Sequence, residues 1–340
     1  MKVSFIVVAY NAGSKLENLL EDLKKQDYNH NDIEIILVDS NSSDNTKDIM
    51  MKFKEINKTF SKVLVLDNPK KILPCGWNIA LEASTGDLIL RVDAHSSLPN
   101  DFISKNVNRI DMGEKIVGGH RISIIDENNP WQKTLLIAEK SIFGSGIATY
   151  RRKEREEYVS TLAHAAYSRE VFKKVGGYDE RLARTEDNEI HYRMKKAGYK
   201  FLLDPTIKSY HHARNSLSKM MKQKYLNGYW IGLTMGISPK CFSIYHFVPL
   251  VFVLALIFSI IFAFVFSGIP LILLLGAYFT FNILNTIFSI ISEKKHLDYL
   301  LLPFIFFLLH LSYGWGTLYG LIKLPFWIRL NKSFEYPIVK

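Results

Sequence analysis

Cysteine is almost absent from this chain of 340 residues, which contains only Cys75 and Cys241. The two lie in regions of different character, so the sequence indicates no disulfide framework and a reducing compartment is the simplest interpretation. The N-terminal sequence MKVSFIVVAYN has one lysine and a short apolar run. That run is too short for the core of a signal peptide and is typical of a β-strand. We therefore expect the N-terminal part to stay in the cytoplasm.

Charge is missing from a long C-terminal stretch. Residues 241–292 include no formally charged side chain, which favours lipid over water as the solvent of this region. Three apolar segments, 246–266, 270–291 and 299–322, each have about the 20 residues that cross a lipid core. The sequence therefore predicts a membrane domain over 243–322. The alternative is a large buried core, and the length of the uncharged run argues against it.

The formal net charge is +10, and basic residues become more frequent next to the apolar region. From Arg214 to Lys240 the sequence has no acidic residue, which favours contact with anionic lipid. Together with Tyr225, Tyr229 and Trp230, this composition predicts a basic interfacial segment over 214–242 that lies on the membrane. The sequence has no zinc-finger, RNP-type or helix-turn-helix signature, so we expect no nucleic-acid partner.

The sequence leaves the topology of the third apolar segment open. Lys294 and Lys295 would lie on the same side as the basic segment 214–242, as the positive-inside rule requires. The basic tail, 323–340, would lie on the opposite side if all three segments crossed. The third segment contains Pro303 and several glycines, so the alternative is a re-entrant segment that returns the tail to the cytoplasm.

Strands and helices alternate in the first hundred residues. Apolar runs at 2–9, 32–38, 62–66 and 87–92 are typical of buried parallel strands. Helical segments separate these runs, which predicts an α/β fold with a doubly wound, mostly parallel sheet. We expect this domain to span 1–213.

The fourth predicted strand ends in a short polar motif. Residues 88–95 (LILRVDAH) bring Asp93 and His95 to its carboxyl end, the edge at which open α/β sheets bind ligands. A carboxylate and an imidazole two residues apart can share a divalent cation, and these donors suit Mn²⁺ or Mg²⁺ bridging a diphosphate. The alternative is an aspartate that caps the following turn beside a solvated histidine.

Four motifs follow one another in a characteristic order: residues 7–11 (VVAYN), 38–46 (VDSNSSDNT), 87–95 (DLILRVDAH) and 185–191 (TEDNEIH). In this order, and over roughly residues 2–230, the chain resembles the family 2 glycosyltransferases of GT-A fold. It resembles most the membrane-bound subgroup of succinoglycan and exopolysaccharide glycosyltransferases, in which the metal motif also reads Asp-Ala-His. The resemblance implies a GT-A domain (Rossmann-like, with a mostly parallel sheet) followed by C-terminal transmembrane helices.

The resemblance also implies a nucleotide-sugar site. Ala9 and Tyr10 would line the nucleotide pocket, and Asp39 would bind the base or the ribose. Lys71 and Arg214 could meet phosphate. The expected nucleotide-sugar-binding residues are Ala9, Tyr10, Asn11, Asp39, Lys71, Asn78, Asp93, Glu186 and Arg214.

A divalent cofactor, Mn²⁺ or Mg²⁺, is expected at Asp93 and His95, where it would also contact the diphosphate. His211 and His212 follow a short apolar strand. One of them, His212 in our assignment, could complete the metal site. The alternative is a simply exposed pair of histidines.

Asp187 is the expected catalytic base. In an inverting transfer an acceptor hydroxyl attacks the anomeric carbon from the face opposite the leaving nucleotide, and a carboxylate takes its proton. A position near a helix N-terminus favours the ionised carboxylate. On the local pattern alone, Glu186 and Asp187 could merely complement the start of a helix, and the order of the motifs favours the catalytic role.

The resemblance thus implies an inverting, metal-dependent transfer of one sugar, from a UDP-sugar, to a polyprenyl-linked glycan acceptor in capsule or exopolysaccharide assembly. The enzyme would be a multi-pass protein of the cell membrane with a cytoplasmic catalytic domain. A processive synthase is an alternative, but residues 223–230 (QKYLNGYW) lack the Arg-Trp of the processive motif. A polyprenyl-phosphate glycosyltransferase and a catalytically silent, membrane-bound nucleotide-sugar sensor are the others.

Overall fold

The computed structural model describes the chain apart from residues 127, 145–154, 214, 292–295, 332–333 and 340 and the side chain of His212. The chain divides into two compact units. The first comprises Met1–Ile124, Thr149–His212 and Ser333–Lys340, and the second comprises Ile125–Ala148 and Ala213–Lys332.

The first unit is an α/β domain, as the sequence predicts. Its elements in chain order are β1 (Val3–Ala9), α1 (Gly13–Lys24), η1 (His30–Asp32), β2 (Ile33–Asp39), α2 (Thr46–Ile56), β3 (Lys62–Asp67), α3 (Leu73–Ala83), β4 (Leu88–Arg91), β5 (Ser96–Ser97), α4 (Phe102–Asp111), β6 (Ile116–Ile124), β7 (Glu157–Val159), β8 (Ala166–Ser168), α6 (Arg169–Val175), α7 (Glu186–Lys196) and β9 (Phe201–His212).

A single mixed sheet organises this unit, with strand order β3-β2-β1-β4-β8-β6-β9-β5 and β7 paired to β9. The first four strands of this order are parallel. Strand β8 is antiparallel to both β4 and β6, whereas β6 and β9 are parallel. The carboxyl ends of β1, β2, β3 and β4 therefore lie along one edge, where the sequence motifs end.

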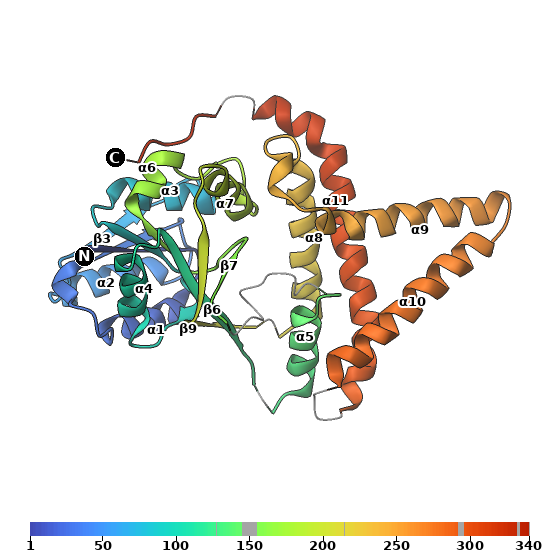
Figure 1. Cartoon of the computed structure of the whole chain (residues 1–340), viewed down its shortest axis with the longest axis horizontal. Coiled ribbons are helices and arrows are strands. Elements are labelled where there is room, and N and C mark those ends of the chain that lie inside the picture. The colour runs from blue at the N-terminus through green and yellow to red at the C-terminus, as the bar shows by residue number, and fades with distance from the viewer. Residues whose placement is uncertain (127, 145–154, 214, 292–295, 332–333, 340) are drawn as a thin grey trace. The chain divides into compact units, whose positions relative to one another are not determined.

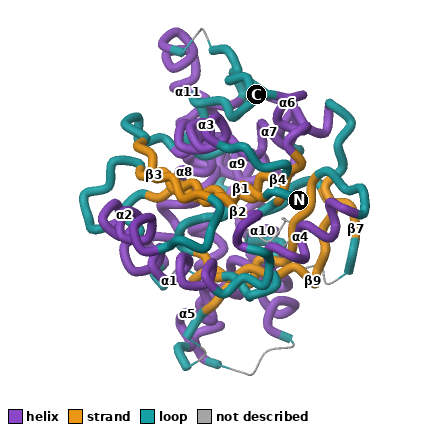
Figure 2. Tube along the Cα trace, turned by 90° about the vertical axis from the view of Figure 1, so that its left-hand side faces the viewer, coloured by secondary structure: helices purple, strands orange, loops and turns teal. Residues whose placement is uncertain are grey.

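Apolar side chains fill both faces of the sheet because successive residues of a buried strand point to opposite faces. Along β1, Phe5 and Val7 join the core shared with α1, α2 and α4, whereas Ile6 and Val8 join the core shared with α3, α6 and α7. Figure 2 shows α1, α2 and α4 on one side of strands β1–β4 and α3, α6 and α7 on the other. The continuous apolar pattern of these strands thus reflects burial from both faces.

A buried carboxylate fixes the turn that leads into β4. Glu34 Oε1 accepts hydrogen bonds from Ser4 Oγ (2.5 Å), from the backbone N–H of Thr85 (2.5 Å) and from that of Gly86 (3.0 Å). Burial raises the pKa of Glu34, but these hydrogen bonds outweigh it and the net shift is downward. The start of β4, and hence the position of its functional end, depends on this cluster.

The second unit is helical. Its elements are α5 (Pro130–Lys140), α8 (Leu217–Thr234), η3 (Pro239–Cys241), η4 (Ile244–Phe247), α9 (Val248–Val265), α10 (Ile269–Ile290), η5 (Leu297–Leu301) and α11 (Leu302–Leu330). In the part of the chain that the structure describes, three segments are long and apolar enough to cross a membrane: Ile244–Val265, Ile269–Ile290 and Leu297–Leu330. Helices α9 and α10 form a hairpin (Figure 1). Helix α11 is continuous and runs past the expected end at 322, so Lys323 and Arg329 lie on it.

Glycines let α8 and α11 approach to backbone contact. A Cβ added to Gly316 would lie 2.1 Å from the carbonyl oxygen of Tyr225, and one added to Gly320 would lie 2.2 Å from that of Tyr229. On α8, a Cβ at Gly228 would lie 2.1 Å from the carbonyl oxygen of Tyr313. Small residues four apart on facing helices are typical of tight packing between membrane helices. Helix α8, in the segment expected to lie on the membrane, is therefore one half of a helix pair.

We predict that Gly316→Leu lowers the thermal stability of the detergent-solubilised protein by several degrees. The side chain has no space against the backbone of α8, and overpacking costs about 1–3 kcal/mol or more. Gly276→Leu on α10 is the control, because a Cβ there meets no atom within 4 Å. Equal melting temperatures for the two variants would contradict the proposed role of glycine in this helix pair.

Candidate active site

The first part of the site joins the carboxyl ends of β1 and β2. The backbone N–H of Ser40 donates to the carbonyl oxygen of Ala9 (2.8 Å), and the buried Asp39 carboxylate accepts from the N–H of Ser42 (3.2 and 3.3 Å). Asn11 has a positive φ of 47°, and its side-chain oxygen accepts from the N–H of Ser43 (2.8 Å). Residues 9–11 and 39–43 therefore form one connected edge.

Tyr10 completes this edge. Its side chain is 55% exposed, although it directly follows a fully buried strand. An exposed aromatic ring and a fixed carboxylate at one strand edge are suited to a planar base and a ribose. The structure brings Ala9, Tyr10, Asn11 and Asp39 to this edge, and their predicted roles stay predictions.

The second part of the site is an ion pair between Arg91, the last residue of β4, and Asp187, in the first turn of α7. The guanidinium contacts both carboxylate oxygens: Nη1 donates to Oδ1, and Nη2 donates to Oδ2 at 2.8 Å. Arg91 is only 7% exposed. Its guanidinium lies 4.8 Å from the centre of the Trp77 ring, and Nη1 also donates to the Tyr178 hydroxyl (2.9 Å).

Arg91 was assigned no role from the sequence, although a charged residue inside an apolar strand is a signal that could have found it. A charge at such a position requires a partner, because burying it unpaired costs several kcal/mol. Its partner Asp187 lies almost a hundred residues later in the chain, so no local pattern connects the two.

Glu186 and Asp187 adopt opposite protonation states although they are adjacent. Burial raises the pKa of Asp187, but the charge and hydrogen bonds of Arg91 outweigh it, so its pKa is lowered. Burial, reinforced by the charge of Asp187, raises the pKa of Glu186 to about 8. Glu186 Oε2 is buried and has no hydrogen-bond partner among the described residues. At neutral pH the site therefore holds an ionised Asp187 beside a neutral Glu186.

The third part of the site lies at Asp93, just after β4. Asp93 Oδ2 lies 3.2 Å from His164 Nε2 and 3.6 Å from Arg121 Nη2. Burial raises the pKa of Asp93, but the hydrogen bond and charge of His164 and the charge of Arg121 outweigh it and hold the pKa well below its usual range. An anionic carboxylate therefore stands where the sequence predicts a metal ligand.

His164 is a site residue that sequence reasoning missed. It is buried, has a positive φ of 46° and lies 2.9 Å through Nδ1 from Ser209 Oγ. Non-glycine residues in this conformation are uncommon and gather at functional sites. The sequence gives no sign of it, because the contact with Asp93 joins residues far apart in the chain.

The donor set at this edge suits Mn²⁺ or Mg²⁺. The contacts of Asp93 with Arg121 and His164 both use Oδ2, and His95 is exposed two residues later. Strand pairing sets His211 opposite Ser96, next to His95. Within the described ranges no three His, Cys, Asp or Glu side chains gather as a metal cluster. Asp93 and His95 can thus supply two ligands, and phosphate oxygens and water must supply the others.

The remaining predicted residues lie apart from these contacts or outside the description. Lys71 is exposed in a turn with a positive φ of 60°. Asn78 uses its side-chain amide on Tyr178, accepting from its N–H (2.7 Å) and donating to its carbonyl oxygen (2.9 Å). Arg214 and the side chain of His212 lie outside the described residues. The roles predicted for these four stay predictions.

A sequence model described as "Glycosyl transferase family 2" matches residues 4–176, which include the Asp93 and His95 motif. The chain belongs to glycosyl transferase family 2.

Curated relatives of this family 2 glycosyltransferase extend the match. It is 27% identical to dolichyl N-acetyl-alpha-D-glucosaminyl phosphate 3-beta-D-2,3-diacetamido-2,3-dideoxy-beta-D-glucuronosyltransferase of Methanococcus voltae, over 94% of this chain and 97% of that protein. It is 28% identical to succinoglycan biosynthesis protein ExoA of Rhizobium meliloti, over 65% of this chain and 66% of that protein. The sequence-based recognition of the family and its exopolysaccharide-type relatives is confirmed.

One solved structure supports the fold. The mannosyltransferase PcManGT of Pyrobaculum calidifontis, determined with GDP-Man and Mn²⁺, matches with a TM-score of 0.61 at 17% identity, over 94% of this chain and 87% of that one. The expected GT-A domain followed by apolar C-terminal helices is therefore confirmed as the fold of this glycosyltransferase.

The raised pKa of Glu186 predicts a stability that falls with pH. The folded protein holds the proton up to a pKa of about 8, whereas the unfolded chain releases it near the ordinary value of about 4.3. Between these values the native state binds more protons, so stability falls as pH rises. We predict that Glu186→Gln raises the melting temperature at pH 8 more than at pH 5. Glu17→Gln, at an exposed position of α1, is the control, and an equal gain at both pH values would contradict the assignment.

Proposed function

We propose that this glycosyltransferase moves one sugar from a nucleotide-sugar, a UDP-sugar in our assignment, to a polyprenyl-linked glycan acceptor, with inversion at the anomeric carbon. The observation that carries the proposal is the ion pair of Arg91 and Asp187. It keeps a carboxylate ionised beside the strand end that bears Asp93 and His95. A site with an anionic base near a diphosphate-binding edge is what an inverting transfer requires.

In the proposed reaction, Tyr10 and Asp39 hold the nucleotide, and residues at the end of β4 meet the diphosphate. Asp187, whose side chain is 36% exposed, accepts the proton of the acceptor hydroxyl as that oxygen bonds to the anomeric carbon. Arg91 fixes the direction of the carboxylate. When bound, a Mn²⁺ or Mg²⁺ ion held by Asp93 and His95 would act as a Lewis acid that neutralises charge on the departing diphosphate.

The acceptor is proposed from the relatives and the apolar helices. The relative from Methanococcus voltae is named for a dolichyl phosphate-linked sugar, and the one from Rhizobium meliloti for succinoglycan biosynthesis. Three apolar helices in this chain support an acceptor that is itself held in lipid. Capsule or exopolysaccharide assembly is the proposed setting.

We predict that Asp187→Asn lowers sugar transfer by about 10²–10⁴-fold and leaves the affinity for the nucleotide unchanged within about twofold, because the amide cannot take the proton. The assay is a panel of UDP- and GDP-sugars with membrane lipid extract, with Mn²⁺ or with EDTA, and mass spectrometry of the product. The wild type should transfer one sugar to a lipid-soluble product when Mn²⁺ is present and should transfer none when EDTA is present.

Asp48→Asn is the matched control, since Asp48 is an exposed carboxylate in the first turn of α2. Full activity of Asp187→Asn would overturn the assignment of the base. Products on soluble acceptors alone would rule out the lipid acceptor, and long polymers would indicate a processive synthase.

We also propose that the enzyme is held in the cell membrane by two complete crossings, with the catalytic unit in the cytoplasm. Strand β9 before the helices and the C-terminal tail after them belong to the same compact unit. Both ends of the helical region therefore lie on one side of the membrane, so the number of crossings between them is even. An even number of crossings would place the basic tail in the cytoplasm with the catalytic unit.

Helices α9 and α10 are the proposed crossings, because they form a hairpin and expose apolar side chains along their length. Helix α11 is proposed to lie at the cytoplasmic membrane surface together with α8. The two run parallel, since contacts advance along both helices from Tyr225 and Gly316 to Tyr229 and Gly320. The exposed Lys219 and Lys222 of α8 and Lys323 and Arg329 of α11 can then reach water and anionic headgroups.

This topology predicts the labelling of single cysteines by a membrane-impermeant maleimide in intact cells. In a Cys75→Ser, Cys241→Ser background, Ser267→Cys at the tip of the hairpin should react from outside. His296→Cys, before α11, and Glu335→Cys, in the tail, should react only after permeabilisation. Labelling of Glu335→Cys in intact cells would support three crossings and contradict the proposal.

A further inference from the structure

The C-terminal tail, residues 334–339, packs on the catalytic unit rather than extending into solvent. Val339 is buried in the same apolar core as Trp77, Tyr178 and Ile190. The carbonyl oxygen of Pro337 accepts a hydrogen bond from the N–H of Gly177 (2.9 Å). A terminal segment with a buried side chain and a backbone hydrogen bond to a distant loop is a built part of the domain.

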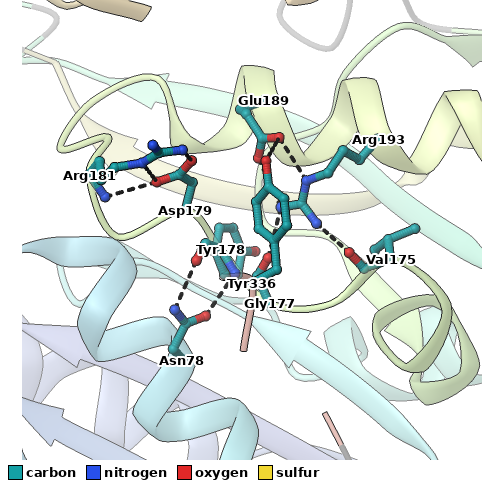
Figure 3. Close-up of polar contacts among 9 residues, drawn as sticks. All are labelled: Asn78, Val175, Gly177, Tyr178, Asp179, Arg181, Glu189, Arg193 and Tyr336. Carbon is teal, nitrogen blue, oxygen red and sulfur yellow. Dashed lines mark hydrogen bonds and ion pairs between the residues drawn. The ribbon is translucent and has the colours of Figure 1, made fainter. Parts of the chain in front are cut away.

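Tyr336 connects this tail to the helix that bears Asp187. Its hydroxyl donates to Glu189 Oε1 (3.1 Å), and its ring centre lies 4.0 Å from the guanidinium of Arg193. Glu189 and Arg193 form an ion pair one turn apart on α7, with Arg193 Nε donating to Glu189 Oε1 at 2.7 Å. Figure 3 shows the Tyr336 ring against both side chains. The tail therefore packs against α7 in the turns that follow Asp187.

The same contacts hold the loop before α7. Arg193 donates to the carbonyl oxygens of Val175 and Gly177, the latter at 2.7 Å. Gly176 has a positive φ of 77°, and a Cβ on Gly177 would lie 2.5 Å from Asn78 Oδ1. Two successive glycines give the backbone wide conformational freedom, so this turn keeps one conformation only if its neighbours impose it.

Asn78 and the tail impose that conformation together. The Asn78 amide binds the N–H and the carbonyl group of Tyr178, and the tail binds the N–H of Gly177. The Tyr178 hydroxyl accepts from Arg91, which holds Asp187. The loop before α7 thus contacts Arg91 through Tyr178, and α7 itself bears Asp187. The tail contacts both the loop and α7.

We propose that the C-terminal tail is a positioning strap for the active site, with Tyr336 as its main contact, and that it aligns Asp187 for proton transfer. This inference rests on the proposed function of Asp187. It gives the chain beyond α11 a role in catalysis.

The test compares four variants in detergent or nanodiscs: Tyr336→Ala, Tyr336→Phe, a truncation after Asn331, and Ile338→Ala as the control, since Ile338 is 86% exposed on the same tail. Tyr336→Ala and the truncation should lower kcat about tenfold or more with donor KM within twofold, because a misplacement of ~1 Å costs up to ~10²-fold. Tyr336→Phe, which keeps the ring on Arg193, should retain at least half of kcat, and Ile338→Ala all of it.

Amide hydrogen exchange supplies a second readout that needs no substrate. In Tyr336→Ala and in the truncation, exchange should accelerate in 176–190 and stay unchanged in β1–β4. Wild-type kcat with unchanged exchange in 176–190 would overturn the inference, as would acceleration spread over the whole domain. If even the wild type transfers no sugar, the proposed function fails, and the exchange measurement still decides whether the strap exists.

Discussion

The ion pair between Arg91 and Asp187 is the contact on which the active site depends. It joins the end of a central strand to the start of α7, two elements that the chain brings together only in the folded domain. Removing Asp187 would leave the buried charge of Arg91 without compensation, which is strongly destabilising. The rings of Trp77 and Tyr178 lie close to the guanidinium, so these contacts fix the arginine in addition to the carboxylate.

The pair also determines how two adjacent carboxyl groups divide their protons. Arg91 lowers the pKa of Asp187, and the resulting negative charge adds to the burial that raises the pKa of Glu186. An ionised Asp187 and a neutral Glu186 thus stand side by side at neutral pH. For the proposed role of Asp187 as the base, the lowered pKa has a cost, since such a carboxylate accepts a proton less readily. In return the carboxylate is already ionised and fixed in direction.

Local patterns in the sequence predicted much of the α/β domain and several residues of the candidate site. Strands β1, β2 and β4 are apolar runs that end in polar motifs, so their existence and the edge they share could be inferred, as could α7 with Thr185 at its N-cap. The resemblance to family 2 glycosyltransferases then assigned roles to Asp39, Asp93 and Asp187. Each of these inferences uses residues that lie close together in the sequence.

Contacts between distant segments could not be predicted. The positions of three side chains, Arg91, His164 and Tyr336, are fixed by partners that lie far away in the chain. The pattern of a single sequence does not indicate which distant residues form such pairs. The hydropathy of the sequence likewise predicted the third apolar segment. It gave no sign that the C-terminal tail packs on the catalytic unit. The proposal of two crossings therefore rests on a tertiary contact rather than on composition.

The most direct test of the account is a double-mutant cycle on the ion pair, with kcat/KM measured for Arg91→Lys, Asp187→Asn and the combined variant. Lysine keeps the charge but not the two parallel hydrogen bonds. If Arg91 acts through Asp187, the single substitution at Arg91 should lower kcat/KM strongly, and the combined variant should be no worse than Asp187→Asn alone. Losses that simply multiply, or full activity of Arg91→Lys, would contradict the central role of the pair.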